Sequence, residues 1–174
     1  QNESFQDLFA RVASVYADDN LHAQRIYNYI SNLWFMPATP VLSNGGTKRG
    51  LPISCFLNEA SDSLGGILDL WSENVWLAAK GGGIGSYWGN LRSIGEKSGK
   101  VGKTSGIIPF IKVMDSLTMA ISQGSLRRGS AACYLPVDHP EIEEFIEMRR
   151  PTGGDPNRKS LNLHHGILIS DAFM

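Results

Sequence analysis

Four short apolar segments alternate with helical segments between residues 53 and 170, and this alternation constrains the fold most. The strand-like segments read "ISCFLN", "GIGSYWGNL", "AACYLPV" and "LNLHHGILIS". Helical periodicity covers residues 64–80, 106–123 and 139–150 between them. Neighbouring parallel strands need a crossover, which is usually a helix, so this order predicts a parallel α/β fold with ligand-binding loops at the strand ends.

The first part of the chain has a different pattern. Apolar residues at helical spacing predict two amphipathic helices before residue 36. Residues 36–52 contain three prolines and three glycines, which predicts a loop. We therefore expect a helical region over residues 1–36 and an α/β domain over residues 37–174.

Composition excludes several classes of protein. Sixteen Lys and Arg residues against seventeen Asp and Glu residues give a net charge of -1, so no global basic field attracts nucleic acid or an anionic membrane. Cys55 and Cys133 are the two cysteines, and their separation fits neither a metal site nor a disulfide framework. We expect no metal site, no membrane span and a cytoplasmic location. The chain begins without an initiator Met and stops directly after a strand-like run, so we expect a segment of a longer protein.

Two glycine-rich motifs resemble nucleotide-binding loops. "KGGGIG", Lys80 to Gly85, fails the dinucleotide fingerprint because Ser86 or Trp88 occupies the position of the third glycine. "GKVGKT" fails the P-loop pattern because Lys97 occupies the upstream glycine position. For "KGGGIG" two interpretations stay open: backbone N–H groups that approach an anion, or a helix end followed by a tight turn.

Polar candidates outside these motifs are ambiguous from local sequence. "QGSLRRGS" and the lysine-rich loop after Arg92 suit phosphate, but charged loops are more often only solvated. The histidines, His139, His164 and His165, lack ligand spacing and are interpreted as structural or surface residues. Cys133 lies in an apolar strand and is interpreted as a small core residue. Local sequence alone favours the same interpretation for Cys55.

The motifs "ATPVLSNGG", "ISCFL", "KGGGIG", "QGSLRRGS" and "VDHPEIEEFIEMRR", in this order, resemble the large catalytic subunit of ribonucleotide reductase. The resemblance implies the end of an N-terminal helical domain followed by roughly the first half of a ten-stranded α/β barrel. It implies an enzyme that reduces the ribose 2′-hydroxyl of ribonucleotides, usually diphosphates, for DNA precursor synthesis. In this family a cysteine thiyl radical starts the reaction, and a cysteine pair supplies two electrons as it closes to a disulfide.

The resemblance also implies roles for residues that match the family motifs. Cys55 matches the first cysteine of the redox pair. The positions that match substrate-binding residues are Thr39, Ser54, Gly82, Gly83 and Arg128. The positions that match an allosteric effector site are Asp62, Ser63, Leu64, Arg92, Ser98, Gly99 and Thr104. The loop that relays effector identity to the substrate matches Gln123, Gly124, Ser125, Leu126 and Arg127.

Partners follow from the same resemblance. It implies ATP and deoxynucleoside triphosphate effectors, a homodimer, the remainder of the large subunit, a metal-containing small subunit that generates the radical, and thioredoxin or glutaredoxin as reductant. The radical cysteine and the second redox cysteine lie downstream in the family, so we expect the isolated chain to be inactive. Two alternatives are an adenosylcobalamin-dependent reductase and a non-catalytic nucleotide-binding regulatory module. The thiol of Cys55 beside Ser54 argues against the module, since an effector site needs no thiol.

Overall fold

The computed structural model describes residues 3–96, 103–121 and 129–174. The chain divides into two compact units, Gln1–Ser54 and Cys55–Met174. Residues 3–54 of the first unit form three helices: α1 (Phe5–Tyr16), α2 (Asn20–Ser31) and α3 (Thr39–Asn44). The described residues of the second unit form four strands and the helices that connect them.

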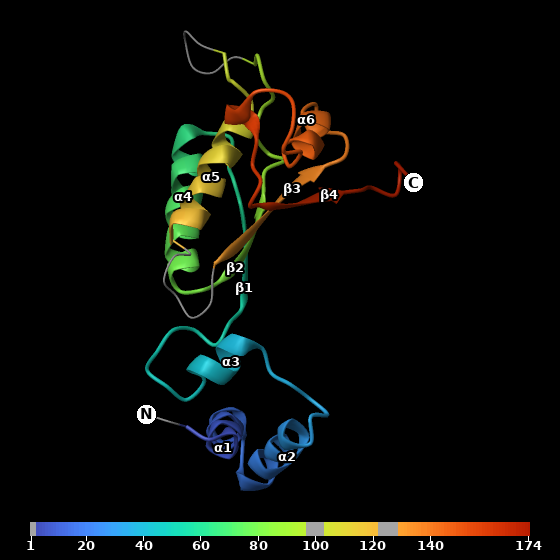
Figure 1. Cartoon of the computed structure of the whole chain (residues 1–174). Coiled ribbons are helices and arrows are strands. Elements are labelled where there is room, and N and C mark those ends of the chain that lie inside the picture. Colours follow the sequence, from blue (N-terminus) through green and yellow to red (C-terminus); the bar gives the residue numbers. More distant parts are fainter. Residues whose placement is uncertain (1–2, 97–102, 122–128) are drawn as a thin grey trace. The chain divides into compact units, whose positions relative to one another are not determined.

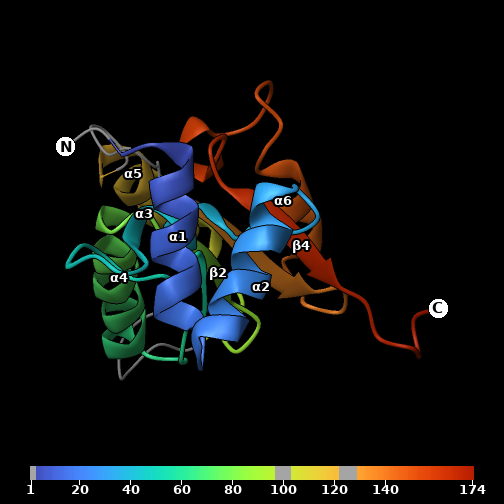
Figure 2. The ribbon, with the colours of Figure 1, turned by 90° about the horizontal axis from the view of Figure 1, so that it is seen from below.

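The two helices expected near the amino terminus are confirmed. Helices α1 and α2 pack side by side (Figure 2). The side chain of Ser4 caps α1 by accepting a hydrogen bond from the backbone N–H of Asp7, and the Asp7 carboxylate accepts one from the Ser4 N–H. The carboxylate of Asp19 caps α2 through the N–H of His22, at 2.7 Å. These caps satisfy N–H groups that have no partner within the helix.

Helix α3 corrects the expectation of a continuous loop over residues 36–52. Pro40 lies in the first turn of α3, where its missing N–H would have no helical partner and its fixed φ suits the helix. Gly45 follows as the C-cap, and its N–H donates to the carbonyl oxygen of Val41 at 2.9 Å. The proline and glycine that indicated a loop therefore mark the start and the end of a short helix.

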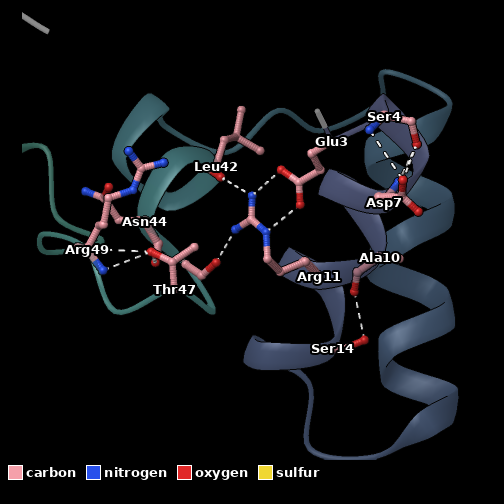
Figure 3. A network of polar contacts seen from close by, with 11 residues as sticks. Glu3, Ser4, Asp7, Ala10, Arg11, Ser14, Leu42, Asn44, Thr47 and Arg49 are labelled. Atoms are coloured by element: carbon pink, nitrogen blue, oxygen red, sulfur yellow. Dashed lines mark hydrogen bonds and ion pairs between the residues drawn. The ribbon is translucent and has the colours of Figure 1, made fainter. Parts of the chain in front are cut away.

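One arginine connects α1 to α3. Arg11 of α1 donates to the carbonyl oxygens of Leu42, at 2.9 Å, and of Gly45 (Figure 3). Its guanidinium also binds both carboxylate oxygens of Glu3, at 2.7 and 2.9 Å. The planar fork thus satisfies carbonyls at the carboxyl end of α3, which have no partner within that helix.

The second unit is a parallel α/β sheet, as the alternation predicted. Its elements in chain order are β1 (Cys55–Glu59), α4 (Leu64–Ala79), β2 (Gly83–Tyr87), α5 (Ile108–Ile121), β3 (Ser130–Pro136), α6 (Ile142–Glu147), the 3-10 helix η1 (Pro156–Arg158) and β4 (His164–Leu168). The strands lie in the order β1-β2-β3-β4, and each pair is parallel. The expected helix over residues 139–150 is shorter than predicted, because residues 137–141 form a turn around Pro140.

The core lies between the sheet and two of the helices. Helices α4 and α5 pack against each other and cover one face of the sheet (Figure 1). Alternate strand residues face these helices and are buried, among them Ile84, Ala131, Cys133 and Leu135. Burial of this apolar surface stabilises the unit. The strand residues that alternate with the buried ones lie on the opposite face of the sheet.

A polar network within this core fixes α4 against two strands. The side chain of Asn74, 3% exposed, accepts from Asn58 Nδ2 at 2.8 Å and donates to Ser86 Oγ at 3.2 Å. Ser86 closes the ring by donating to Asn58 Oδ1 at 2.7 Å. Because each buried group finds a partner, the network holds α4, β1 and β2 in one arrangement.

Candidate functional site

Cys55 lies at the amino end of β1 and is exposed. It is in register with Gly83 of β2, which is in register with Ser130 of β3. Register partners point to the same side of a sheet, so these three positions form a row on the face opposite α4 and α5. The sequence analysis counted Ser130 as part of the polar motif "QGSLRRGS" and did not predict a role for it; only the register of the strands places it in this row. A thiol, a residue without a side chain and a hydroxyl therefore lie side by side in this row.

Cys133 lies on the other face of the sheet, in register with the buried Ser86. Its side chain is 0% exposed and its Sγ lies 4.0 Å from Met114 Sδ, which confirms the core interpretation. Burial, with a smaller contribution from the charge of Asp115, raises the pKa of the Cys133 thiol far above its usual range. The sheet separates Cys55 from Cys133, so these two cysteines cannot form a redox pair.

The glycine run before β2 ends α4. Gly81 has φ +76°, its N–H donates to the carbonyl oxygen of Ala78, and the Gly82 N–H donates to that of Leu77, both at 2.9 Å. These bonds form a Schellman motif, which confirms the helix-end interpretation of "KGGGIG". A Cβ on Gly82 would lie 2.9 Å from the ring of Phe56, so the glycine permits close packing beside β1.

Five of the predicted effector residues line one pocket. Its volume is about 170 Å³, and its lining residues are Asp62, Ser63, Leu64, Ile67, Leu91, Arg92, Thr104, Gly106, Ile107 and Phe110. The predicted residues among them are Asp62, Ser63, Leu64, Arg92 and Thr104. They come from the loop after β1, the start of α4, and the segment between β2 and α5. The other lining residues are mainly apolar, and their contribution depends on the tertiary fold rather than on any sequence motif.

A charged pair forms the polar side of this pocket. The Nε of Arg92 lies 3.0 and 2.9 Å from the two carboxylate oxygens of Asp62, and its Nη2 lies 2.9 Å from Oδ2. The Arg92 N–H also donates to Asp62 Oδ1, at 3.1 Å. These bonds hold the pKa of the Asp62 carboxyl below its usual range. Ser63 is the N-cap of α4, and its hydroxyl oxygen stabilises the start of this helix by accepting from the Gly66 N–H at 3.0 Å.

The pocket and the thiol lie at opposite ends of α4. Ser63 and Leu64 begin this helix, whereas its last residue, Ala79, is followed by the glycine turn that leads to Gly83 beside Cys55. Sixteen helical residues span about 24 Å at 1.5 Å per residue. The structure therefore separates the five effector residues of the pocket from the predicted redox residue by the length of one helix.

Two further predicted residues, Thr39 and Ser54, belong to the first unit. Thr39 is the first residue of α3 and Ser54 is the last residue of the first unit. The predictions for Ser98, Gly99, Arg128 and the loop residues Gln123, Gly124, Ser125, Leu126 and Arg127 lie outside the described residues.

In residues 3–96, 103–121 and 129–174, no three His, Cys, Asp or Glu side chains gather as metal ligands. Within the same ranges, no helix has both the length and the apolar character needed to cross a membrane.

Two family models match the chain, and they describe successive domains. Residues 1–50 match the all-alpha domain of ribonucleotide reductase, and residues 53–174 match its barrel domain. The domain boundary predicted at residue 36 stays a prediction.

Individual relatives agree with the family models. The chain is 46% identical over 170 residues to the ribonucleoside-diphosphate reductase large subunit of Invertebrate iridescent virus 3, covering 97% of this chain and 26% of that protein. It is 37% identical over 157 residues to the ribonucleoside-diphosphate reductase subunit alpha of Chlamydia muridarum, covering 90% of this chain and 15% of that protein. The chain thus spans about a quarter or less of the length of these relatives. Their names do not favour the adenosylcobalamin alternative.

A solved structure supports the fold. The class Id ribonucleotide reductase alpha subunit of Actinobacillus ureae superposes with a TM-score of 0.79 at 24% identity, covering 99% of this chain and 31% of that one. This likeness agrees with helices followed by the first strands of the reductase barrel. With both family models matched in succession, the chain belongs to the ribonucleotide reductase large-subunit family.

Proposed function

We propose that this chain is the part of a ribonucleoside-diphosphate reductase large subunit that carries one redox cysteine and the allosteric effector site. The complete protein reduces ribonucleoside diphosphates to deoxyribonucleotides for DNA precursor synthesis. The observation that carries the proposal is the arrangement along α4, with a pocket containing Asp62 and Arg92 at its start and exposed Cys55 beyond its end. Two separated sites fit an enzyme in which one nucleotide regulates the reduction of another.

In the proposed reaction, the Cys55 thiol and a second thiol from outside this chain are oxidised to a disulfide. The two thiols give up two electrons and two protons, and the ribose 2′-hydroxyl leaves as water. Carbon 2′ gains a hydrogen in place of the hydroxyl, so atoms and electrons balance. An external dithiol such as thioredoxin or glutaredoxin then reduces the disulfide by exchange, for which Cys55 must be accessible. The exposure of Cys55 supports this step, while the buried Cys133 lacks the required access.

The roles of the neighbouring residues follow from their positions beside Cys55. Gly83 contributes no side chain at the register position next to the thiol, which leaves room for a ribose. Gly82 allows β1 and the helix end to approach each other. Thr39, Ser54 and Arg128 are proposed to hold the substrate.

At the other end of α4, the pocket is proposed to bind ATP or a deoxynucleoside triphosphate. Arg92 suits the phosphates, since guanidinium groups bind phosphate oxygens with directed hydrogen bonds. Asp62 suits a ribose hydroxyl, which donates to a carboxylate. Ser98, Gly99 and Thr104 are proposed to complete the phosphate site, and residues 123–127 to relay effector identity to the substrate.

The remaining elements of the enzyme are proposed to lie outside residues 1–174. They include the cysteine that forms the thiyl radical, the second redox cysteine and a small subunit with a metal centre that generates the radical. The active form is proposed to be a cytoplasmic homodimer of the complete large subunit. The isolated chain should show no reductase activity.

Differential labelling of thiols in the complete large subunit tests the redox assignment. The protein, with its small subunit, is allowed one turnover without external reductant and is then alkylated, and mass spectrometry reads the peptide that contains Cys55. Cys55 should change from labelled to protected, and dithiothreitol should restore labelling. Cys133 serves as the internal control and should not change. If product forms while Cys55 stays fully reactive, the redox role is wrong and a binding role without chemistry gains support.

A further inference from the structure

The segment between β2 and α5 carries five of the residues that line the pocket: Leu91, Arg92, Thr104, Gly106 and Ile107. Its described parts pair with each other: the Gly95 N–H donates to the Thr104 carbonyl oxygen at 2.9 Å, and the Thr104 N–H donates to the Glu96 carbonyl oxygen at 3.0 Å. Residues 91–96 and 103–107, which we call the stem of the segment, thus lie side by side. The ends of this stem are held by the turn before α6 and by η1.

His139 holds one end of the stem. It is 7% exposed, and its Nε2 lies 3.2 Å from the carbonyl oxygen of Leu91, a residue that lines the pocket. Its Nδ1 lies 3.1 Å from the N–H of Glu141. Since a carbonyl accepts and an N–H donates, both contacts require the neutral ring with hydrogen on Nε2.

Glu141 holds the other end. It is 4% exposed, and both carboxylate oxygens lie 3.2 Å from the N–H of Ile107, another pocket residue. The preceding Gly106 has φ +83°, and a Cβ there would overlap the Glu141 carboxylate. Glycine at 106 therefore allows the carboxylate to reach the main chain.

Arg158 adds a third contact from η1. Its Nη1 donates to the carbonyl oxygen of Ser105 at 3.3 Å, and its Nη2 lies 3.9 Å from Glu141 Oε1. The guanidinium is itself held by Glu144, whose Oε2 lies 2.7 Å from Nη2. The three side chains thus contact the main chain on both sides of the stem, at Leu91 and at residues 105–107.

We propose that His139, Glu141 and Arg158 form a clamp that fixes the stem of the effector-binding segment, which makes them positioning residues for effector binding. This inference rests on the proposed effector site. The clamp contacts the main chain of the segment, so it sets the shape of the pocket independently of the side chains that bind the ligand. A segment held in its binding conformation before the ligand arrives loses less conformational entropy on binding, which raises affinity.

The chemistry of Glu141 supports a positioning role rather than simple filling of the core. Burial raises the pKa of the Glu141 carboxyl, although the Ile107 N–H acts in the opposite direction. Ionisation at this position therefore costs folding free energy, and an apolar side chain would fill the space at lower cost. The carboxylate instead provides two acceptor oxygens aimed at one N–H of the pocket lining.

Substitutions at Glu141 in the complete large subunit test the clamp. Glu141→Leu removes both acceptors at similar size, Glu141→Gln keeps one, and Glu143→Leu on the exposed side of α6 is the matched control. The measurements are the Kd for dTTP, the Kd for CDP without effector, and hydrogen exchange over residues 91–96 and 103–107.

Glu141→Leu should raise the dTTP Kd roughly tenfold, as expected for a lost hydrogen bond to a charged group. The CDP Kd should stay within about twofold, since the pocket and Cys55 are separated by α4. Exchange of the Ile107 amide should become faster. Glu141→Gln should recover most of the affinity, and Glu143→Leu should behave as wild type.

Two results would overturn the clamp: wild-type dTTP affinity with unchanged exchange in Glu141→Leu, or equal losses for dTTP and CDP, which indicate a general loss of structure. If Glu141→Leu does not fold, His139→Phe and His139→Gln replace it, because only the glutamine can still donate to Leu91. Failure of the proposed effector site is recognised separately, since wild type would then not bind dTTP or Arg92→Ala would not weaken binding. The exchange measurement needs no ligand and still tests the clamp in that case.

Discussion

Asp62 and Arg92 are thirty residues apart in the sequence, and both carboxylate oxygens of Asp62 accept from the Arg92 side chain at 2.9 to 3.0 Å. The pair lies at the wall of the pocket, with both side chains about one-third exposed. The same two groups can therefore bind each other or contact a nucleotide. This competition makes the pair a direct test of the proposed effector site.

Substitution of the two partners should separate phosphate binding from ribose binding. Arg92→Ala should weaken dTTP binding roughly ten- to a hundredfold, because a hydrogen-bonded positive charge is lost. Asp62→Asn should weaken dTTP binding but strengthen inorganic tripolyphosphate binding, since it removes the negative charge beside Arg92 and one of the two oxygens that can accept from a ribose hydroxyl. Isothermal titration of the complete large subunit measures both ligands. If Asp62→Asn changed the Kd values for dTTP and tripolyphosphate in the same direction and by the same factor, a ribose contact would be contradicted.

The same pair should give a defined pH dependence of stability. The folded-state pKa of Asp62 is lowered, so its contribution to the free energy of unfolding is present above the unfolded-state pKa of about 3.9. That contribution should decrease as the pH falls through the lower, folded-state pKa. The difference in unfolding free energy between wild type and Asp62→Asn should accordingly be constant above about pH 5 and shrink in stronger acid. Denaturant titrations between pH 2.5 and 7 measure this difference, and a difference that grows toward acid would reverse the assigned sign.

The two cysteines should differ in reactivity under native conditions. Cys55 is exposed, whereas Cys133 is buried and its thiol has a raised pKa, which disfavours the reactive thiolate. Iodoacetamide at pH 8 should label the Cys55 peptide at least about tenfold faster than the Cys133 peptide. Denaturant should abolish the difference. Rapid native labelling of Cys133 would show that the sheet does not protect it as described.

Arg11 should stabilise the carboxyl end of α3 through two carbonyl groups. Arg11→Ala should lower the free energy of unfolding by about 1–2 kcal/mol, because the Leu42 and Gly45 carbonyls lose a charged donor. Arg11→Lys should recover only part of the lost free energy of unfolding, since an ammonium lacks the planar fork of a guanidinium. Arg25→Ala on the exposed side of α2 is the matched control. Denaturant unfolding gives the energies, and hydrogen exchange over residues 39–47 should be faster in Arg11→Ala alone.

The periodicity of apolar residues and the positions of Gly and Pro in the sequence predicted most of the fold. The apolar alternation predicted four parallel strands and their connecting helices, because burial patterns of strands and helices are local. Helix α3 was missed because Pro40 and Gly45 indicate a loop unless their positions within a helix are known. The start of α6 at Ile142, three residues later than predicted, was missed because His139 and Pro140 belong to a turn that contacts distant residues.

The candidate site depended more strongly on tertiary structure. The family motifs in the sequence indicated Cys55 and the effector residues, but local sequence could not separate the roles of Cys55 and Cys133. The sheet decided that difference, since the alternation of each strand and the register between strands place Cys55 on the open face and Cys133 under the helices. His139 was interpreted from sequence as a structural or surface residue, and its contact with Leu91 joins residues 48 positions apart. Sequence determines local patterns and motif chemistry, whereas contacts between distant main-chain segments exist only once the sheet and helices have packed.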